Sequence, residues 1–240
     1  MTNIDPLTYI KTALAREYQA QIYRQQKPKP IHESLVITLS RDYGALGELV
    51  AEGLGQALGI PVYDKEVLAL LAEKAKADPL SFQSFDEQST EGIKSFFYSL
   101  VSGNAATLPE YRRHLIESLI ELARKDCIII GRGAHLILHG QKVLRVRVVG
   151  TKAVCAQRIA VESNIPLAEA EKRVLEINHK RNQAVVDMYA ETIKHCSLEH
   201  ADTFDLVINT DHLTVDAVKD LILVAVRQLG HIPKGATQQV

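Results

Sequence analysis

The sequence predicts an α/β protein: a three-layer αβα domain on a mostly parallel five-stranded sheet, with an N-terminal helical extension. Two observations lead to this prediction. Short apolar runs that end in polar or glycine-containing loops alternate with longer amphipathic stretches, which is typical of a parallel sheet covered by helices. The chain has 240 residues, 46% hydrophobic and 5% aromatic, which is enough for one such domain with a mainly aliphatic core.

Composition and charge argue against several classes of function. Lys and Arg number 28 and Asp and Glu number 29, which gives a net charge of −1. A balance so close to zero disfavours a broad nucleic-acid surface. The longest apolar runs are about six residues, far fewer than the roughly 20 that span a bilayer. We therefore expect neither a nucleic acid nor a membrane as partner.

Cysteine usage indicates a reducing compartment. Cys127, Cys155 and Cys196 are widely spaced and form no CxxC pair, so neither a zinc site nor a redox motif is predicted. His195 and His200 flank Cys196, but we interpret them as surface polar residues rather than metal ligands. No signal peptide pattern opens the chain. We expect a cytoplasmic protein without a metal site built from its own side chains.

An N-terminal helix is predicted over residues 5–26. Asp5 suits the N-cap and Pro6 the first helical position. One apolar stripe recurs every three or four residues: Leu7, Ile10, Leu14, Tyr18 and Ile22. Residues 27–30 read Lys-Pro-Lys-Pro and form a stiff linker. We interpret residues 1–30 as an appendage whose stripe packs on the domain, on a partner or on a second copy of the chain.

Residues 31–230 are predicted to form the main domain. Its predicted strands are 35–39, 60–63, 127–130, 143–149 and 204–209. Its predicted helices are 48–58, 64–76, 93–100, 111–125, 151–163, 166–194 and 215–229. The irregular stretch 78–110 is long for a connection, so we interpret it as a substrate lobe. Residues 231–240 are predicted to be a flexible tail.

The loop after the first strand, residues 40–47, carries the first chemical signal. Gly44 and Gly47 allow backbone N–H groups to approach a phosphate, and the N-terminus of the next helix adds its positive dipole end. A phosphate loop also needs a lysine and a hydroxyl after its last glycine, whereas this chain has Glu48 and Leu49. By motif alone, a phosphate loop and a simple glycine turn are equally favoured.

Basic residues near strand ends add to this signal. Arg41 lies in the same loop, and Arg132 follows the third strand between two glycines. The carboxyl ends of parallel strands meet at one edge of a sheet, so these two arginines should converge. Arg158 and 180–181 (Lys-Arg) lie on later helices, and planar guanidinium groups suit phosphate. Asp64 is the one carboxylate to which we assign chemistry, with a helix N-cap as the simpler alternative.

Five segments carry a resemblance to a known family: Ile37–Gly47, Leu58–Glu66, Phe96–Leu100, Cys127–Leu138 and Phe204–Thr210. In order and spacing they resemble the cytidylate kinase-like family, a branch of the P-loop nucleoside monophosphate kinases. The resemblance covers residues 35–226. It implies a P-loop kinase-like fold and transfer of the γ-phosphoryl group of ATP to CMP, dCMP or a similar monophosphate, with Mg²⁺.

Two sets of candidate site residues follow from the loop, the strand ends and the resemblance. The catalytic candidates are Arg41, Asp64, Arg132, Arg158 and Arg181. The candidates for binding ATP are Ser40, Tyr43, Gly44, Ala45, Leu46, Gly47, Glu48, Lys180, Asn209 and Thr210. The resemblance implies that Arg132 contacts the acceptor phosphate, that Arg158 and 180–181 close over the triphosphate, and that 209–210 lie near the donor adenine.

The chain departs from the family pattern at three places. Glu48 and Leu49 stand where members often have Arg-Glu, His135 replaces an acid, and residues 178–181 read Asn-His-Lys-Arg instead of Asp-Lys-Arg-Arg. Replacing a cation by a carboxylate changes the local charge by two units. At about 4 Å and an effective dielectric constant near 20, each unit is worth roughly 4 kcal/mol before screening. Glu48 should therefore impair turnover unless it points away from the phosphates or helps to hold Mg²⁺.

Three hypotheses remain at the level of the sequence. An active nucleoside monophosphate kinase predicts Arg41 and Arg132 in one cleft with Glu48 turned outward. A nucleotide-binding pseudo-kinase, acting as a sensor or scaffold, predicts Glu48 inside the cleft. An interaction module that uses residues 1–30 is compatible with either.

Overall fold

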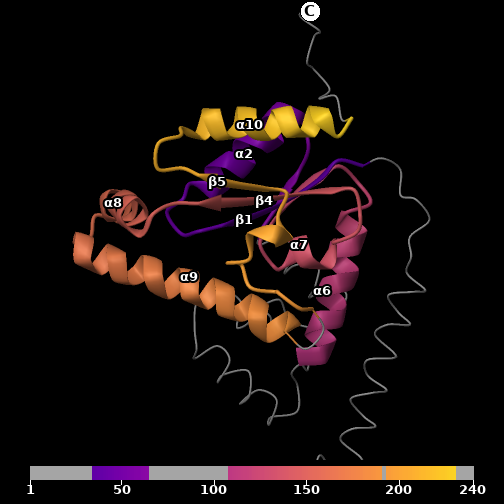
Figure 1. Ribbon diagram of the computed structural model, residues 1–240, viewed down its shortest axis with the longest axis horizontal. Coiled ribbons are helices and arrows are strands. Elements are labelled where there is room, and N and C mark those ends of the chain that lie inside the picture. Colours follow the sequence, from indigo (N-terminus) through magenta and orange to yellow (C-terminus); the bar gives the residue numbers. More distant parts are fainter. Residues whose placement is uncertain (1–33, 65–107, 191–192, 231–240) are drawn as a thin grey trace, which may run out of the picture. The chain divides into compact units, whose positions relative to one another are not determined.

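A computed structural model describes residues 34–64, 108–190 and 193–230 (Figure 1). The chain divides into two compact units, residues 1–33 and 34–240, and the described residues all belong to the second. Several predicted features lie outside the described residues. They are the N-terminal helix and its linker, the helices 64–76 (apart from Asp64) and 93–100, the substrate lobe up to residue 107, and the C-terminal tail.

The predicted parallel sheet is confirmed. Its strands are β1 (Val36–Arg41), β2 (Val62–Tyr63), β3 (Cys127–Ile130), β4 (Val143–Val149) and β5 (Leu206–Asn209). All pairings are parallel and the order is β2-β3-β1-β4-β5. From β1 the chain builds one side of the sheet and then crosses to the other. The crevice outside the carboxyl end of β1 is therefore the position where ligands bind in open α/β sheets.

Helices cover both faces of this sheet, which gives the three predicted layers (Figure 1). On one face lie α2 (Gly47–Leu58) and α10 (Val215–Gln228), which contact each other. The other face carries α6 (Leu108–Leu122), α7 (Ala134–Ile137) and the C-terminal part of α9 (Leu167–Tyr189). The helix α8 (Lys152–Ser163) packs against α9. No helix in the described part of the chain is long and apolar enough to cross a membrane.

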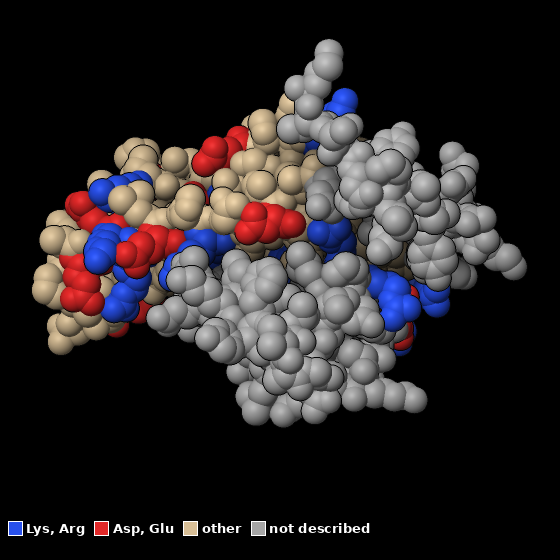
Figure 2. All heavy atoms as spheres, turned by 90° about the horizontal axis from the view of Figure 1, so that it is seen from below, with Lys and Arg blue, Asp and Glu red and all other residues tan. Residues whose placement is uncertain are grey.

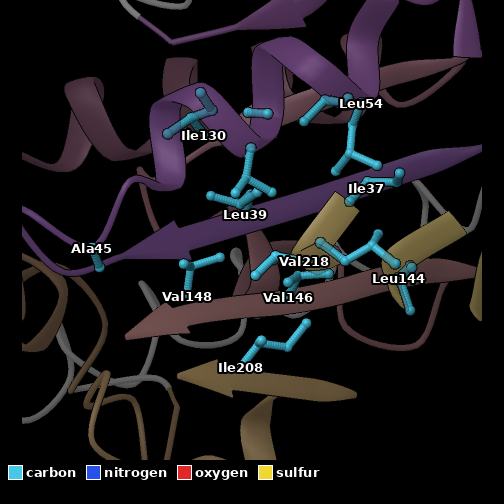
Figure 3. Packing of buried hydrophobic residues seen from close by; sticks show 14 of the residues in the cluster. Ile37, Leu39, Ala45, Leu54, Ile130, Leu144, Val146, Val148, Ile208 and Val218 are labelled. Carbon is cyan, nitrogen blue, oxygen red and sulfur yellow. The ribbon is translucent and has the colours of Figure 1, made fainter. Parts of the chain in front are cut away.

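The two faces of the sheet differ in polarity. Ile37 and Leu39 of β1 join Val146 and Val148 of β4 in an aliphatic core under α2 and α10 (Figure 3). Successive strand residues point to opposite faces, so the alternate positions of β1 and β4 face α7 and α9. Those positions include Thr38, Ser40, Arg145 and Arg147. The second face is therefore polar toward the carboxyl end of the central strands.

Several elements differ from the prediction. The strand β1 runs on to Arg41 because it pairs with β4 as far as Val148, whereas residues 40–41 were expected in a loop. The helix α7 and a 3₁₀ turn at Ala201–Thr203 were not predicted. Finally, α9 ends at Tyr189 rather than at residue 194. Beyond its end, Cys196 and Leu198 pack in the hydrophobic core between the sheet and the helices α6, α7 and α9.

The exposed surfaces of α8 and α9 carry interspersed charges of both signs (Figure 2). Lys152 lies 3.1 Å from Glu171, and Arg173 lies 3.0 Å from Glu169. Exposed pairs of this kind contribute little to stability, about 0–1 kcal/mol each. Because neighbouring charges cancel, this surface does not form a basic patch of the kind that binds nucleic acid.

Candidate functional site

The loop between β1 and α2, residues 42–46, follows a tightly constrained path. A Cβ on Gly44 would lie 2.8 Å from the carbonyl oxygen of Cys155, and one on Gly47 would lie 2.4 Å from the Cβ of Arg41. Leu46, the N-cap of α2, has a φ of 63°, in the left-handed region that disfavours side chains. The loop thus presents the N-terminus of a 12-residue helix, which has a positive dipole end.

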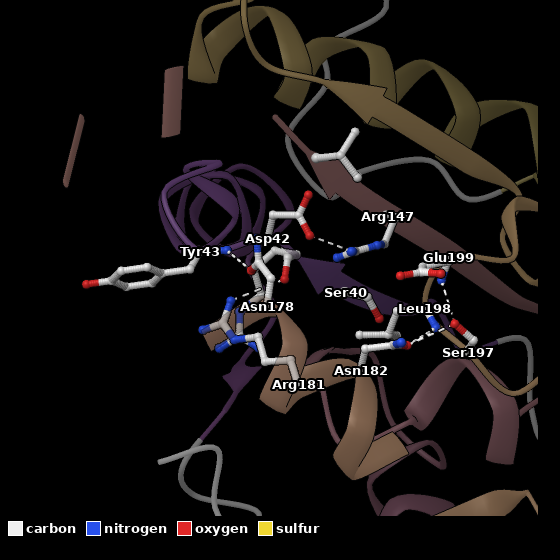
Figure 4. A network of polar contacts seen from close by, with 12 residues as sticks. Ser40, Asp42, Tyr43, Arg147, Asn178, Arg181, Asn182, Ser197, Leu198 and Glu199 are labelled. Carbon is white, nitrogen blue, oxygen red and sulfur yellow. Dashed lines mark hydrogen bonds and ion pairs between the residues drawn. The ribbon is translucent and has the colours of Figure 1, made fainter. Parts of the chain in front are cut away.

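One face of α9 holds the first part of this loop (Figure 4). The Tyr43 backbone N–H donates to Asn178 Oδ1 at 2.7 Å. Arg181 Nη1 donates to the Arg41 carbonyl oxygen at 3.2 Å, and its guanidinium carbon lies 5.9 Å from the centre of the Tyr43 ring. Lys180 is half-buried beside Arg181. The helix that carries Lys180 and Arg181, which the resemblance places over the triphosphate, therefore contacts the β1–α2 loop directly.

Arg158 and Thr210 hold the second part of the loop. Arg158 Nη1 donates to the Gly44 carbonyl oxygen at 3.2 Å and to Thr210 Oγ1 at 2.9 Å. The hydroxyl of the buried Thr210 donates to the Ala45 carbonyl oxygen at 3.2 Å. Asn209 is exposed, and its side-chain oxygen accepts a hydrogen bond from the backbone N–H of Asp211. The guanidinium of Arg158 is thus used to brace backbone carbonyl groups.

A cluster of charges lies at the start of α2. Arg41 is 6% exposed, and its Nε donates to Glu48 Oε1 at 2.8 Å. Arg181 Nη2 is 3.6 Å from the same Glu48 oxygen, and Asp64 Oδ2 is 3.7 Å from Arg41 Nη2. Burial raises the pKa of Glu48, but the charge and hydrogen bond of Arg41 and the charge of Arg181 bring it below its ordinary value. Glu48 is therefore ionised at neutral pH and shared by two arginines.

Next to this cluster is a pocket at the carboxyl ends of β1 and β3, which we call the arginine pocket. It is lined by Ser40, Arg41, Leu115, Gly131, Arg132, Gly133, Arg181, Ala184, Val185, Met188, Tyr189 and Leu198. Arg41 and Arg132 converge in it, as the topology predicted, and Arg181 of α9 joins them. Glu48 pairs with two of these arginines. The hypothesis of an active kinase required Glu48 to be turned away from these arginines. The structure instead shows it in contact with them.

The turn that carries Arg132 has an unusual backbone. Gly131, Arg132 and Gly133 all have positive φ angles, of 71°, 57° and 65°. The Tyr189 hydroxyl donates to the Arg132 carbonyl oxygen at 3.1 Å, and a Cβ on Gly133 would lie 2.3 Å from the Tyr189 ring. A non-glycine residue held in this region is typical of functional sites. The C-terminal end of α9 therefore fixes the turn that places Arg132 in the pocket.

Sequence reasoning missed the ion pair of Asp42 with Arg147. Arg147 Nη2 donates to Asp42 Oδ1 at 2.5 Å, and Arg147 is 8% exposed. Burial lowers the pKa of Arg147, Asp42 raises it, and the charges of Arg181 and Arg41 lower it further. The available signal was the alternation of β4, because an arginine between buried valines must face a polar partner.

His135, at the position where the resemblance implies an acid, is a buried neutral imidazole. It is 1% exposed, stacks on Phe204 at 4.5 Å between ring centres, and has Nδ1 3.5 Å from Ser40 Oγ. Burial, together with the charges of Arg147 and Arg145, lowers the pKa of His135 to about 3. The imidazole of His135 is therefore uncharged near neutral pH.

The site fits the phosphates of a nucleotide better than it fits a metal. Arginines and a helix N-terminus are phosphate ligands. Leu49 stands where a phosphate loop places its Mg²⁺-binding hydroxyl, and the nearby carboxylates of Asp42, Glu48 and Asp64 are paired with arginines. The described residues hold no group of three or more metal-binding side chains. Any Mg²⁺ would therefore be held mainly by the nucleotide phosphates.

Sheet order, glycine-containing loop and arginine pocket together define a P-loop kinase-like protein. The sequence profile of the cytidylate kinase-like family matches residues 36–212, so the chain belongs to this family. A comparison with curated proteins gave no match.

Two solved structures are similar to this chain, and the first of them shares its fold. An uncharacterized protein from Eubacterium ventriosum is 18% identical, with a TM-score of 0.60 over 81% of this chain and 99% of that chain. Shikimate kinase from Acinetobacter baumannii, in complex with shikimate, is 18% identical, with a TM-score of 0.46 over 82% and 96%.

Proposed function

We propose that the protein transfers the γ-phosphoryl group of ATP to a nucleoside monophosphate bound in the arginine pocket, with CMP or dCMP as the acceptor. One observation carries the proposal. Arg41, Arg132 and Arg181 come from three separate segments of the chain and line one pocket at the carboxyl ends of neighbouring strands. Membership of the cytidylate kinase-like family supports the choice of acceptor.

The chemistry of phosphoryl transfer suits this arrangement. Catalysis rests mainly on positioning the reactants and on compensating the charge of the transferring group. Arginine forks bind two phosphate oxygens at once. We assign the acceptor phosphate to the three arginines, and the donor phosphates to the β1–α2 loop with its helix N-terminus. Asp64, 3.7 Å from Arg41, would orient the acceptor or take its proton.

The remaining candidates have supporting roles in this proposal. Arg158 and Thr210 brace the loop through its carbonyl groups, which would hold it in place for a phosphate. Lys180 would approach the triphosphate, and Asn209 would lie beside the adenine of the donor. The protein would hold ATP through these groups, and the triphosphate would be the main ligand of Mg²⁺.

A second candidate function is nucleotide binding without turnover, as a sensor or scaffold. It is favoured by Glu48, whose carboxylate pairs with Arg41 and Arg181. A negative charge at this point opposes the charge compensation that transfer needs. At about 4 Å and an effective dielectric constant near 20, the opposition is worth roughly 4 kcal/mol before screening.

Turnover and binding assays separate the two functions. ATP consumption with Mg²⁺ is measured with CMP, dCMP, UMP or AMP, and calorimetry measures binding of the same nucleotides. We expect turnover with CMP or dCMP that Arg132→Ala abolishes. Arg173→Ala serves as the matched control, because Arg173 pairs with Glu169 on the outer side of α9. Binding without turnover would favour the second function, and the absence of both would contradict both.

A further inference from the structure

Glu48 is the charged residue in the first turn of α2, and one of its carboxylate oxygens contacts two arginines of the arginine pocket. Its Oε1 lies 2.8 Å from Arg41 Nε and 3.6 Å from Arg181 Nη2. We propose that Glu48 is an internal counter-ion that occupies the position of a ligand phosphate oxygen between Arg41 and Arg181, so that the pocket admits only ligands able to displace it. This inference rests on the proposed function of the pocket.

The two arginines require a negative partner in this place. Arg41 is 6% and Arg181 9% exposed, and a buried cation without a counter-charge is costly. Asp64 is farther from Arg41, at 3.7 Å. Among the carboxylates of the described residues, Glu48 therefore lies nearest to both guanidinium groups.

The carboxylate can also leave this place. The Glu48 side chain is 43% exposed, so water can solvate the carboxylate when it turns outward. No comparable freedom exists for Arg41, whose Cβ and Cγ pack against Gly47. Displacement would therefore move the glutamate and leave the arginines in position for the incoming group.

Exchange of Glu48 for a ligand has a clear charge dependence. A phosphate monoester carries a charge of about −1.5 to −2 near neutral pH, whereas the carboxylate carries −1. A dianionic phosphate compensates the two arginines better than Glu48 does. A nucleoside without phosphate offers no compensation and would leave the existing pair intact. Glu48 thus determines specificity by making the phosphate charge of the ligand a condition for entry.

The inference predicts opposite effects of one substitution on stability and on binding. In Glu48→Gln the buried arginines lose the carboxylate that Glu48 shares between them, so the thermal midpoint without ligand should fall. The same variant removes the competitor for the ligand phosphate, so CMP should bind more tightly. If Glu48 only stabilised the loop, its loss would weaken both properties.

Calorimetry with CMP, and with inorganic phosphate as a second probe, tests this on the full chain. We expect Glu48→Gln to bind CMP about fivefold or more tightly than the unaltered protein, with a lower thermal midpoint. Glu52→Gln is the control, because Glu52 lies one turn further along α2 and is exposed. It should change neither property. Glu48→Asp keeps the charge on a shorter side chain and should show a smaller gain.

The outcomes distinguish this inference from the proposed function. If the unaltered protein binds CMP and neither Glu48 variant binds it more tightly, the inference is wrong and the proposed function stands. If only the Glu48 variants bind CMP, the inference is confirmed, because Glu48 then blocks CMP binding completely in the unaltered protein. If no variant binds CMP or inorganic phosphate, the proposed function fails and the inference fails with it. If the Glu48→Gln protein does not fold, the CMP affinity of the Glu48→Asp protein decides the test.

Discussion

At the scale of single residues, the described part of the site is organised by arginines and their partners. Arg41 pairs with Glu48 and Asp64, Arg147 with Asp42, and Arg158 with backbone carbonyl groups. A charged hydrogen bond is about twice as strong as a neutral one. These pairs therefore determine where the β1–α2 loop lies, although most of them join residues far apart in the sequence.

His135 makes stability depend on pH. Its pKa is lowered to about 3 in the folded chain, from 6.5, so the folded state stays unprotonated while the unfolded chain takes up a proton. The contribution of His135 to stability is thus fully present above about pH 6.5 and is lost as pH falls toward 3. Between pH 7 and pH 5 the loss should be about 2 kcal/mol.

Denaturant unfolding at pH 7 and pH 5 checks this prediction. We expect His135→Gln to lose markedly less stability over this interval than the unaltered protein does. His200→Gln is the comparison, because His200, the N-cap of the 3₁₀ turn, is only half-buried, whereas His135 is fully buried. Equal pH dependence in all three proteins would contradict the prediction.

At the scale of elements, α9 connects the two loops of the site. Asn178 and Arg181 hold the β1–α2 loop, and Tyr189, two to three turns later, holds the turn of Arg132. One rigid helix therefore sets the spacing between the arginines of the pocket. The sequence identified 166–194 as helical, but only the folded chain shows what its inner face contacts.

Tyr189→Phe isolates the contribution of α9 to the position of Arg132. The substitution removes the hydroxyl that donates to the Arg132 carbonyl oxygen and keeps the ring that packs on Gly133. We expect a stability loss of about 1 kcal/mol and a several-fold weaker affinity for CMP, because Arg132 is held in a strained conformation. Thermal unfolding and calorimetry measure the two effects. An unchanged CMP affinity would show that the hydroxyl does not position Arg132.

At the scale of the whole molecule, the chain divides into residues 1–33 and the kinase-like unit, residues 34–240. The apolar stripe at 5–26 remains the prediction that bears on partners. We expect removal of residues 1–30 to change the oligomeric state and to leave nucleotide binding unaltered, because every described residue that lines the arginine pocket comes later in the chain. Light scattering and calorimetry on the truncated chain test this. An unchanged mass would argue against an assembly role for the stripe.

Local patterns were enough to predict the sheet, its longer described helices and the convergence of Arg41 with Arg132. Buried strands and amphipathic helices are encoded by nearby residues, and a parallel sheet brings strand ends to one edge. The sequence also identified Glu48 as the main departure from a phosphate loop. These features depend on the periodicity of the residues and on the order of strands and helices, and both can be inferred from a single sequence.

The direction of Glu48, the pair of Asp42 with Arg147 and the contacts of α9 were decided only by the tertiary structure. Asp42 and Arg147 are 105 residues apart, and Tyr43 and Asn178 are 135 apart. Such pairs form because burial leaves each charge or N–H group no water to bind, so it takes whichever partner the packed helices and strands bring within reach. No local pattern in the sequence records that choice.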